Sequence, residues 1–351
     1  MEKTKIDPWS TAYQNNRVKL IDAVPLDVPL CICIEPTNVC NFKCLMCFQS
    51  SEEYKVGGGP FSKMDMSLFY KIINDIKSMV GKYGKIKLMK LYNSGEPLLN
   101  SDIGKMVKII KDADICVNLE ITTNGSLLTP ELSRQFVEYG LDYLRVSIYA
   151  VDKDEEKRIT QTDVDPNIIA EKVKYLYDYR NNAHKEKPFV CAKMIHVDDA
   201  TSAQFKEMFI DKSDEQVIDI PWNVPKLKEN ALDKFYGGEK NGKLAQQKYL
   251  DTALYKSRKV CRYPFTHIII RNNGDVVVCC ADWSRDTNLG NVREKTIEQI
   301  WNSRGLYDFR VMQLTTKGIN HPLCATCELP LRDFTEDNLD DLPIERLSFK
   351  E

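Results

Sequence analysis

Residues 40–47 read CNFKCLMC, which places Cys40, Cys44 and Cys47 on one short segment. Three thiolates at this spacing can bind three irons of a cubane [4Fe-4S] cluster, and the fourth iron then stays open to a ligand that is not protein. Because the chain has 12 cysteines in 351 residues, the same spacing also arises by chance, and the sequence around the motif decides its meaning.

The motif comes soon after an apolar run at residues 30–34 that we predict to be a β-strand. From there, strand-like and helix-like segments alternate. We expect further strands at 86–92, 116–122, 142–149, 189–197 and 216–220, and helices from Asp65 to Val80, at 101–113, from Thr129 to Gly140, at 166–182 and at 201–211. Six such units predict an α/β fold in which parallel strands with outer helices curl into a (β/α)6 partial TIM barrel.

Polar motifs follow the predicted strands. The second strand is followed by residues 93–97 (NSGEP), the third by 122–125 (TTNG), and Ser147 lies near the end of the fourth. In barrel-like α/β folds the functional residues gather where strands end and loops begin. A Gly-Glu-Pro alone would be an ordinary turn, but next to the cysteine segment it indicates a functional site.

The cysteine segment together with Gly95-Glu96-Pro97 resembles the pattern of radical S-adenosylmethionine (SAM) enzymes over residues 30–225. The resemblance implies that SAM binds the open iron of a [4Fe-4S] cluster held by the three cysteines. Reductive cleavage of SAM then yields a 5'-deoxyadenosyl radical, which removes a hydrogen atom from the substrate. It also implies an electron donor such as flavodoxin or ferredoxin.

The same resemblance implies contacts to the cofactor. Glu96 would bind the methionyl ammonium, which suits a carboxylate. Met46 stands where the family usually has an aromatic residue, and its adaptable side chain can cover the adenine. Ser147 and Arg158 resemble the contacts to ribose and to the methionyl carboxylate, although a core serine and a solvated helix arginine stay open alternatives. Further cofactor-binding positions are Phe48, Thr122 and Asn124.

The run Gly57-Gly58-Gly59 could suggest a phosphate-binding loop. It lacks the Lys-Ser/Thr signature that such a loop carries. We therefore expect a mobile loop over the mouth of the cluster site.

A second set of cysteines lies in the last third of the chain. Cys261 and Cys279 flank a predicted β-hairpin whose turn is residues 272–275 (NNGD), and Cys324 and Cys327 form a Cys-x-x-Cys pair near the end. Four thiolates suit structural zinc as well as an iron-sulfur cluster. Residue types alone leave that choice open.

The order of this set resembles the twitch form of the SPASM extension, which carries an auxiliary [4Fe-4S] cluster in radical SAM enzymes. No further cysteine follows within Pro330 to Asp333, so the resemblance implies one auxiliary cluster held by Cys261, Cys279, Cys324 and Cys327. The spacing within the set is similar to that in radical SAM enzymes that oxidise a secondary alcohol of an aminocyclitol. We predict an N-terminal extension (1–29), a radical SAM partial barrel (30–225), a linker (226–258), an auxiliary-cluster domain of hairpin and helix (259–330) and a C-terminal tail (331–351).

Composition narrows the setting. With 43% hydrophobic residues and 49 cationic against 51 acidic residues, the chain is typical of a soluble globular protein without a nucleic-acid partner. Neither a signal peptide nor an apolar stretch of membrane-spanning length is found, so we expect no membrane partner and a cytoplasmic location. In a reducing compartment, twelve cysteines fit metal or redox chemistry better than disulfides.

These features predict a radical SAM oxidoreductase. Only about thirty residues precede the first strand, too few for the leader-binding domain of peptide-modifying relatives. We therefore expect a small polyol as substrate, such as a sugar, cyclitol or nucleotide sugar, and oxidation of a secondary alcohol. Radical epimerisation, modification of a ribosomal peptide or protein, and a non-catalytic metal-binding protein remain alternatives.

An epimerase needs a hydrogen donor. Cys280 neighbours a predicted cluster ligand, and Cys191 lies on the fifth strand, so either thiol is a candidate catalytic residue. Strand alternation puts Cys191 and Lys193 on one face and His196 on the other. The alternative for each of these residues is a purely structural role, as a packed core side chain or a solvent-facing one.

Overall fold

The computed structural model describes residues 17–251, 253–255, 257 and 259–349. Its first six strands are parallel neighbours in chain order, with β1 at one side and β6 at the other. This confirms the predicted (β/α)6 arrangement. The strands are β1 Cys31–Ile34, β2 Ile86–Lys90, β3 Cys116–Thr123, β4 Tyr143–Ile148, β5 Phe189–Ile195 and β6 Glu215–Asp219.

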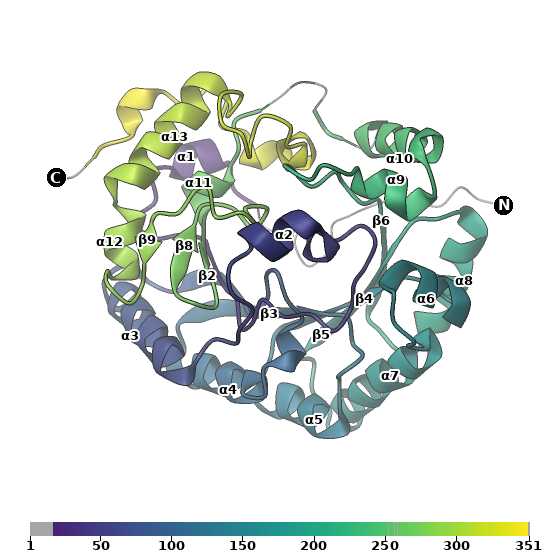
Figure 1. Ribbon diagram of the computed structural model, residues 1–351. Helices are drawn as coiled ribbons and strands as arrows, with labels where there is room; N and C mark the ends of the chain where they lie inside the picture. Colours follow the sequence, from purple (N-terminus) through teal and green to yellow (C-terminus); the bar gives the residue numbers. More distant parts are fainter. Residues whose placement is uncertain (1–16, 252, 256, 258, 350–351) are drawn as a thin grey trace.

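Helices cover the outer face of this curved sheet, and Figure 1 shows them as an arc around it. Their starts follow local rules: Asp65 accepts a hydrogen bond from Leu68 N at the start of α3, and Thr129 caps α5 ahead of Pro130. The predicted helices are confirmed within a few residues. They are α3 Met66–Tyr83, α4 Ile103–Ala113, α5 Pro130–Glu138, α7 Pro166–Asn182 and α8 Asp199–Phe209.

Strand alternation gives the sheet two different faces. Residues such as Met89, Leu119 and Leu144 are fully buried between the sheet and the helices. Their neighbours along the strands, such as Lys90, point to the concave face inside the barrel, because successive side chains of a strand alternate. Most of the charged side chains of β2 to β6 therefore lie on the concave face.

The C-terminal segment continues the same sheet. β7 pairs with β1 in parallel and leads into the antiparallel strands β8 and β9, so one sheet of nine strands runs from β6 to β9. The expected hairpin is therefore present, and it is joined to the barrel edge. This part comprises α11 Tyr263–Thr266, β7 His267–Ile270, β8 Asp275–Val277, β9 Gly290–Asn291, α12 Ile297–Trp301 and α13 Arg304–Thr316.

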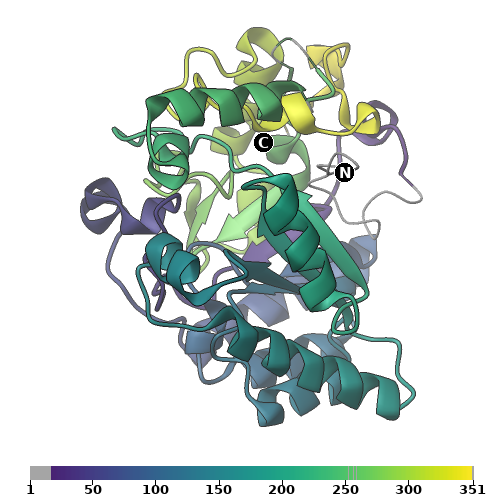
Figure 2. The same ribbon diagram turned by 90° about the vertical axis from the view of Figure 1, so that its right-hand side faces the viewer.

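The stretch predicted as a linker contains two helices, α9 Ala231–Tyr236 and α10 Glu239–Asp251. Leu232 and Phe235 of α9 are buried, and the i, i+3 spacing puts both on one face of a short helix. Figure 2 shows these helices at the same end of the molecule as the C-terminal segment, with the outer helices α4, α5 and α7 at the other end. The domain boundaries themselves stay predictions.

The two ends of the described chain pack together. Leu20 of α1 (Leu20–Ala23) and Val24 share an apolar cluster with Leu339 and Leu342 of the tail. The first sixteen residues of the predicted N-terminal extension lie outside the described residues. Within the described part, the extension and the tail therefore form one cluster.

The glycine run spans the end of a short helix and the start of the loop after it: Gly57 is the last helical residue, Gly58 caps the helix and Gly59 follows it. Helix α2 (Glu52–Gly57) lies in front of the sheet in Figure 1. The Tyr54 ring lies 6.3 Å from that of Trp283, and Arg285 donates a hydrogen bond to the Gly58 carbonyl at 3.0 Å. Contacts from the C-terminal segment therefore dock this helix.

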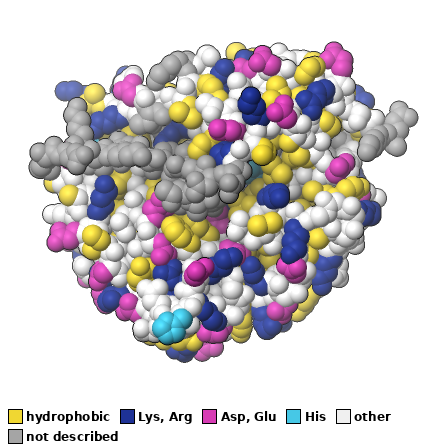
Figure 3. Space-filling view, turned by 180° about the vertical axis from the view of Figure 1, so that it is seen from behind, with side chains coloured by type: hydrophobic (Ala, Val, Ile, Leu, Met, Phe, Trp, Pro, Cys, Tyr) yellow, Lys and Arg dark blue, Asp and Glu magenta, His cyan; other side chains and the backbone are white. Residues whose placement is uncertain are grey.

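The surface carries mixed charge. On the face opposite that of Figure 1, basic and acidic side chains are interspersed without a field of one sign (Figure 3). Across the described residues, no helix combines the length and the apolar character needed to cross a bilayer.

Candidate functional site: two cysteine sets beside a polar barrel face

The first cysteine segment lies directly after β1 and is fixed by backbone contacts. Lys43 N and Leu45 N donate to the carbonyls of Thr160 and Ile159 at 2.9 Å, at the end of helix α6 (Lys153–Thr160). The Gln49 amide donates to the carbonyls of Asn38 and Ser94, both at 2.7 Å. The segment is thus tied to α6 and to the loop that follows β2.

The three cysteines lie near enough for their charges to act on one another. Burial and then the charges of Cys47 and Cys40 raise the pKa of Cys44, which is only 6% exposed. The ring of Tyr149 lies 6.1 Å from that of Phe42 within this segment, and burial and the charges of Cys44, Cys47 and Cys40 raise the pKa of Tyr149 well above its usual range. The sequence analysis missed Tyr149, which follows the end of β4 and therefore lies at the same edge of the sheet.

Glu96 reaches the same edge, but its carboxylate is turned into the protein. It accepts hydrogen bonds from Leu98 N at 3.0 Å, Thr123 Oγ1 at 2.6 Å and Asn124 N at 2.8 Å, and it is 3% exposed. Burial raises its pKa to about 7. In this conformation Glu96 joins the loops after β2 and β3, and its contact to a methionyl ammonium stays a prediction.

Gly95 permits this arrangement by its size. A Cβ atom there would lie 2.4 Å from the Thr37 carbonyl oxygen and 2.5 Å from that of Val39, so any side chain would push the cysteine segment away from the loop after β2. The Glu96 amide donates to Val39 O at 2.8 Å. The Gly-Glu pair therefore packs against the backbone that leads into the cysteines.

The remaining predicted cofactor residues fall into two groups. Asn124 reaches the cysteine segment, since its Nδ2 donates to Asn41 Oδ1 at 3.0 Å, while Thr122 and Ser147 lie on the concave face. Thr122 Oγ1 accepts from Arg145 Nε at 3.1 Å and donates to Glu120 at 3.3 Å. All three thus border the space inside the barrel mouth.

Three other predicted positions lie around the cysteine segment. Met46 packs between the barrel core and a small apolar cluster that includes Ile159 of α6 and Phe235 of α9. The Phe48 ring lies 5.2 Å from that of Tyr54. Arg158 is bound by Glu155, at 2.7 and 2.6 Å, and also donates to the Phe235 carbonyl at 3.2 Å. Its guanidinium joins α6 to α9 in this conformation.

The second set of cysteines lies around one pocket, and its role as cluster ligands stays a prediction. One small pocket is lined by Cys261, Cys279, Cys324 and Cys327, together with apolar residues such as Phe309 and Leu323. Residues far apart in the sequence meet there because Cys279 follows β8, whose partner β7 begins soon after Cys261.

The sulfur environments fit cluster thiolates. Cys40 accepts from Phe42 N, Cys279 from Ala281 N and Cys324 from Gln313 Nε2, each at 3.4 Å. Such N–H donors tune protein-bound iron-sulfur clusters. Across the described residues, no group of His, Cys, Asp and Glu converges as tightly as a single metal ion requires.

The two candidate hydrogen donors differ in access. Cys191 is fully buried among Tyr143, Val217 and Phe189 on the barrel floor. Cys280 is only half-buried and packs against Cys33 and Ile269 on the concave side. Of the two, Cys280 is the thiol that a bound molecule could reach.

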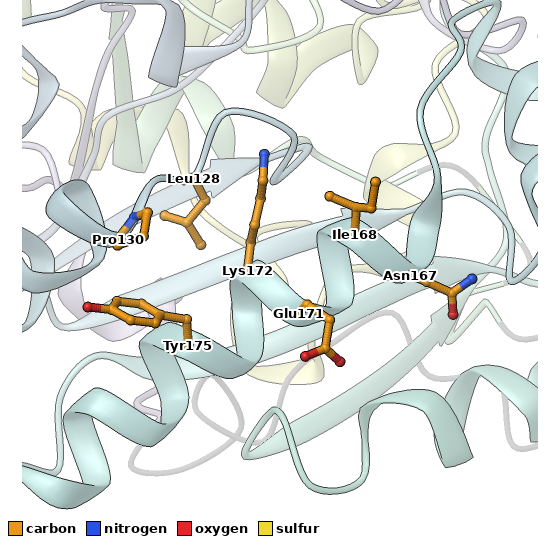
Figure 4. Close-up of a pocket in the computed structure, with 7 residues that line it drawn as sticks. All are labelled: Leu128, Pro130, Asn167, Ile168, Glu171, Lys172 and Tyr175. Carbon is orange, nitrogen blue, oxygen red and sulfur yellow. The ribbon is translucent and has the colours of Figure 1, made fainter.

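A separate hollow lies on the outside of the barrel, between the start of α5 and α7 (Figure 4). Its walls are mostly apolar, with Leu128, Ile168 and Tyr175 around the aliphatic part of Lys172. Lys172 donates to the Ser126 carbonyl. This hollow contains no cysteine or histidine and takes no part in the site described above.

Family comparisons agree with this arrangement. A model of the radical SAM superfamily matches residues 34–208, and a model of the SPASM iron-sulfur cluster-binding domain matches residues 261–328. A Pyrococcus furiosus protein, named "tungsten-containing aldehyde ferredoxin oxidoreductase cofactor-modifying protein", is 26% identical over 329 residues, which cover 84% of this chain and 86% of that protein.

Solved structures share the fold. The structure of BtrN with AdoMet and 2-DOIA superposes with a TM-score of 0.54 at 17% identity, over 91% of this chain and 97% of BtrN. Streptococcus suis SuiB with S-adenosylmethionine gives a TM-score of 0.59 at 18% identity, over 88% of this chain and 74% of SuiB. With both domain models matched in the expected order, the chain belongs to the radical SAM superfamily and carries a SPASM iron-sulfur domain, which implies a [4Fe-4S] cluster with SAM and an auxiliary cluster.

Proposed function

We propose that this radical SAM enzyme oxidises a secondary alcohol of a small polyol bound on the concave face of the barrel. One observation carries the proposal: the two cysteine sets lie at opposite ends of the paired strands β1 and β7. The first set follows the carboxyl end of β1, whereas Cys261 precedes β7 and Cys279 follows its antiparallel partner β8. A four-residue strand spans about 13 Å, a length comparable to that of a small substrate bound along it.

In this proposal Cys40, Cys44 and Cys47 hold the SAM-binding cluster, and Cys261, Cys279, Cys324 and Cys327 hold the auxiliary one. When bound, SAM and the first cluster supply a radical that removes a hydrogen atom, and the second cluster supplies an acceptor for one electron. The alcohol thereby loses a carbon-bound hydrogen atom, its hydroxyl proton and one electron, which together make a ketone. An electron donor such as flavodoxin or ferredoxin would reduce the first cluster.

The relatives support a small substrate. The Pyrococcus furiosus protein is named for modifying a cofactor, and BtrN was crystallised with the small molecule 2-DOIA. The share of each chain that aligns is high for both. Peptide modification, as in the SuiB complex with a precursor peptide, stays the less supported alternative.

A second candidate is radical epimerisation, and the position of Cys280 favours it. A half-buried thiol beside the concave face could return a hydrogen atom to the substrate from the side opposite to the one attacked. The alcohol would then be inverted and not oxidised.

The test runs the anaerobically reconstituted enzyme with SAM, dithionite and a panel of polyols in deuterated water. Formation of 5'-deoxyadenosine together with a ketone that carries no new carbon-bound deuterium supports oxidation. An inverted alcohol with one deuterium, absent in Cys280→Ala, overturns oxidation in favour of epimerisation. If 5'-deoxyadenosine forms only with peptides, the small-molecule proposal is wrong.

A further inference from the structure

The concave face of the barrel carries a row of charged side chains that the cysteine chemistry does not use. They alternate with core residues along consecutive strands, so they point toward the barrel interior. The row consists of Lys90 on β2, Glu120 on β3, Arg145 on β4, Lys193 on β5 and Asp219 on β6.

The first of two ionic clusters in this row consists of Lys90, Glu120 and Arg145. Arg145 forms an ion pair with Glu120 and donates to the Tyr92 hydroxyl at 2.9 Å, and Lys90 Nζ lies 3.9 Å from the Glu120 carboxylate. Glu120 is completely buried, but the side chains of Lys90 and Arg145 remain 22% and 18% exposed. Two cations thus share one carboxylate, and each keeps part of its side chain exposed.

The second ionic cluster consists of Lys193, Asp219 and Arg332. The Asp219 carboxylate lies 2.6 Å from Lys193 Nζ and 3.1 Å from Arg332 Nη1. Burial acts against the charge of Asp219, yet Lys193 and Arg332 lower its pKa, so it stays ionised. Arg332 belongs to the 3-10 helix Leu329–Arg332 that follows the second cysteine pair, and it links that segment to β6.

The two clusters adjoin. Arg145 pairs with Cys191, and Ser147 pairs with Lys193, in the parallel register of β4 and β5. Arg145 and Lys193 are therefore diagonal neighbours on the same face of adjacent strands. Four cations, Lys90, Arg145, Lys193 and Arg332, thus share this face with the carboxylates of Glu120, Asp219 and Glu215, the last of which pairs with Cys191 in the register of β5 and β6.

We propose that the substrate carries a phosphate group, and that Arg145 and Lys193, with Lys90 and Arg332 behind them, bind this group on the concave face. A phosphate monoester carries a charge of about −1.5 to −2 at neutral pH, which suits a face on which these four cations outnumber the carboxylates. An arginine also offers paired N–H donors that fit phosphate oxygens. The inference rests on the proposed function, and it narrows the polyol to a phosphorylated one, such as a sugar phosphate or a nucleotide sugar.

Calorimetry on the anaerobically reconstituted protein tests the proposal with inorganic phosphate and pyrophosphate as probes, and with acetate and uncharged myo-inositol as comparators. We expect phosphate or pyrophosphate to bind, and Lys193→Gln and Arg145→Lys each to weaken that binding by about tenfold or more. The matched control is Lys108→Gln, which removes an ion pair with Asp112 on the outer helix α4 and leaves affinity unchanged.

Several results would overturn the phosphate site: no binding of either probe, equal affinity for acetate, or unchanged affinity in both variants. Iron content and circular dichroism identify a variant that has simply lost its fold. Arg145→Lys is used in place of Arg145→Gln because it keeps a cation beside Glu120. Formation of 5'-deoxyadenosine from SAM in the absence of substrate is measured as a separate assay. A protein that cleaves SAM but binds no phosphate contradicts the phosphate site and leaves the proposed radical chemistry intact.

Discussion

At the scale of single residues, Glu96 has two candidate roles that mutations separate. Its carboxylate satisfies three donors in a buried position, so Glu96→Ala leaves Leu98 N, Thr123 Oγ1 and Asn124 N without their acceptor. We expect this variant to lose about 2–4 kcal/mol of the free energy of unfolding, measured by denaturant titration. Glu96→Gln keeps an acceptor and should fold with its iron intact.

The isosteric variant then tests the cofactor contact. If the negative charge binds the methionyl ammonium, Glu96→Gln weakens SAM binding in equilibrium dialysis. Its loss of unfolding free energy stays below that of Glu96→Ala, because the remaining amide oxygen still accepts from one side of the site. Thr123→Val, which removes one donor and no charge, serves as control. Unchanged SAM affinity in Glu96→Gln would leave Glu96 as a scaffold residue only.

The burial of the Glu156 carboxyl group leads us to expect that the stability of the protein depends on pH. It is fully buried in α6, it accepts from Ala150 N at 2.9 Å, and its Oε1 has no hydrogen-bond partner among the described residues. Burial raises its pKa from the ordinary 4.5 to about 7. Since the folded state favours the protonated form, this stabilising contribution is complete below about pH 4.5 and is lost as the pH rises through about 7.

We therefore expect Glu156 to lower the wild-type free energy of unfolding by on the order of 2 kcal/mol between pH 5.5 and 8. In Glu156→Gln the contribution of Glu156 to the decrease in unfolding free energy is lost. The contribution of Glu96 remains, because Glu96 titrates in the same range. The exposed Asp154→Asn on the same helix should follow the wild type. Denaturant unfolding at both pH values decides, and a Glu156→Gln profile parallel to the wild type contradicts the assignment.

At the scale of elements, helix α2 depends on the conformation of Gly59. This residue has φ of +79°, and a Cβ there would lie 2.5 Å from the Arg285 guanidinium that holds the Gly58 carbonyl. Gly59→Ala should destabilise the docked helix by about 1–2 kcal/mol and speed hydrogen exchange over residues 52–58. Gly81→Ala is the control, since a Cβ there meets nothing within 4 Å. Equal exchange in both variants would mean that other contacts hold α2.

At the scale of the whole molecule, the two cysteine sets predict two independent clusters. Anaerobically reconstituted protein should contain about eight irons, and replacing Cys40, Cys44 and Cys47 together by Ala should leave about four. Replacing Cys116, which is buried on β3 away from both sets, by Ser should leave the iron content unchanged. Zinc that persists in the triple variant, with no iron, would identify the second set as a zinc site. Metal analysis distinguishes the outcomes.

Much of this molecule was predictable from the sequence, because the deciding patterns are local. Apolar residues at helical spacing and caps such as Asp65 and Thr129 place the outer helices, and apolar runs place the strands. The first cysteine set was recognisable from its spacing on one loop, and the second from its resemblance to the twitch extension, because its members come from separate segments. Local periodicity and ligand spacing depend only on residues within a turn or a loop of one another.

Tertiary structure alone decided the rest. The pairing of β1 with β7 joins residues more than 230 positions apart, and it places the two cysteine sets at opposite ends of the same strands. The inward turn of Glu96, the neighbourhood of Tyr149, and the cluster of Lys193, Asp219 and Arg332 likewise depend on partners from distant segments. A side chain's direction and charge state follow from the groups packed around it, and a one-dimensional pattern does not contain those neighbours.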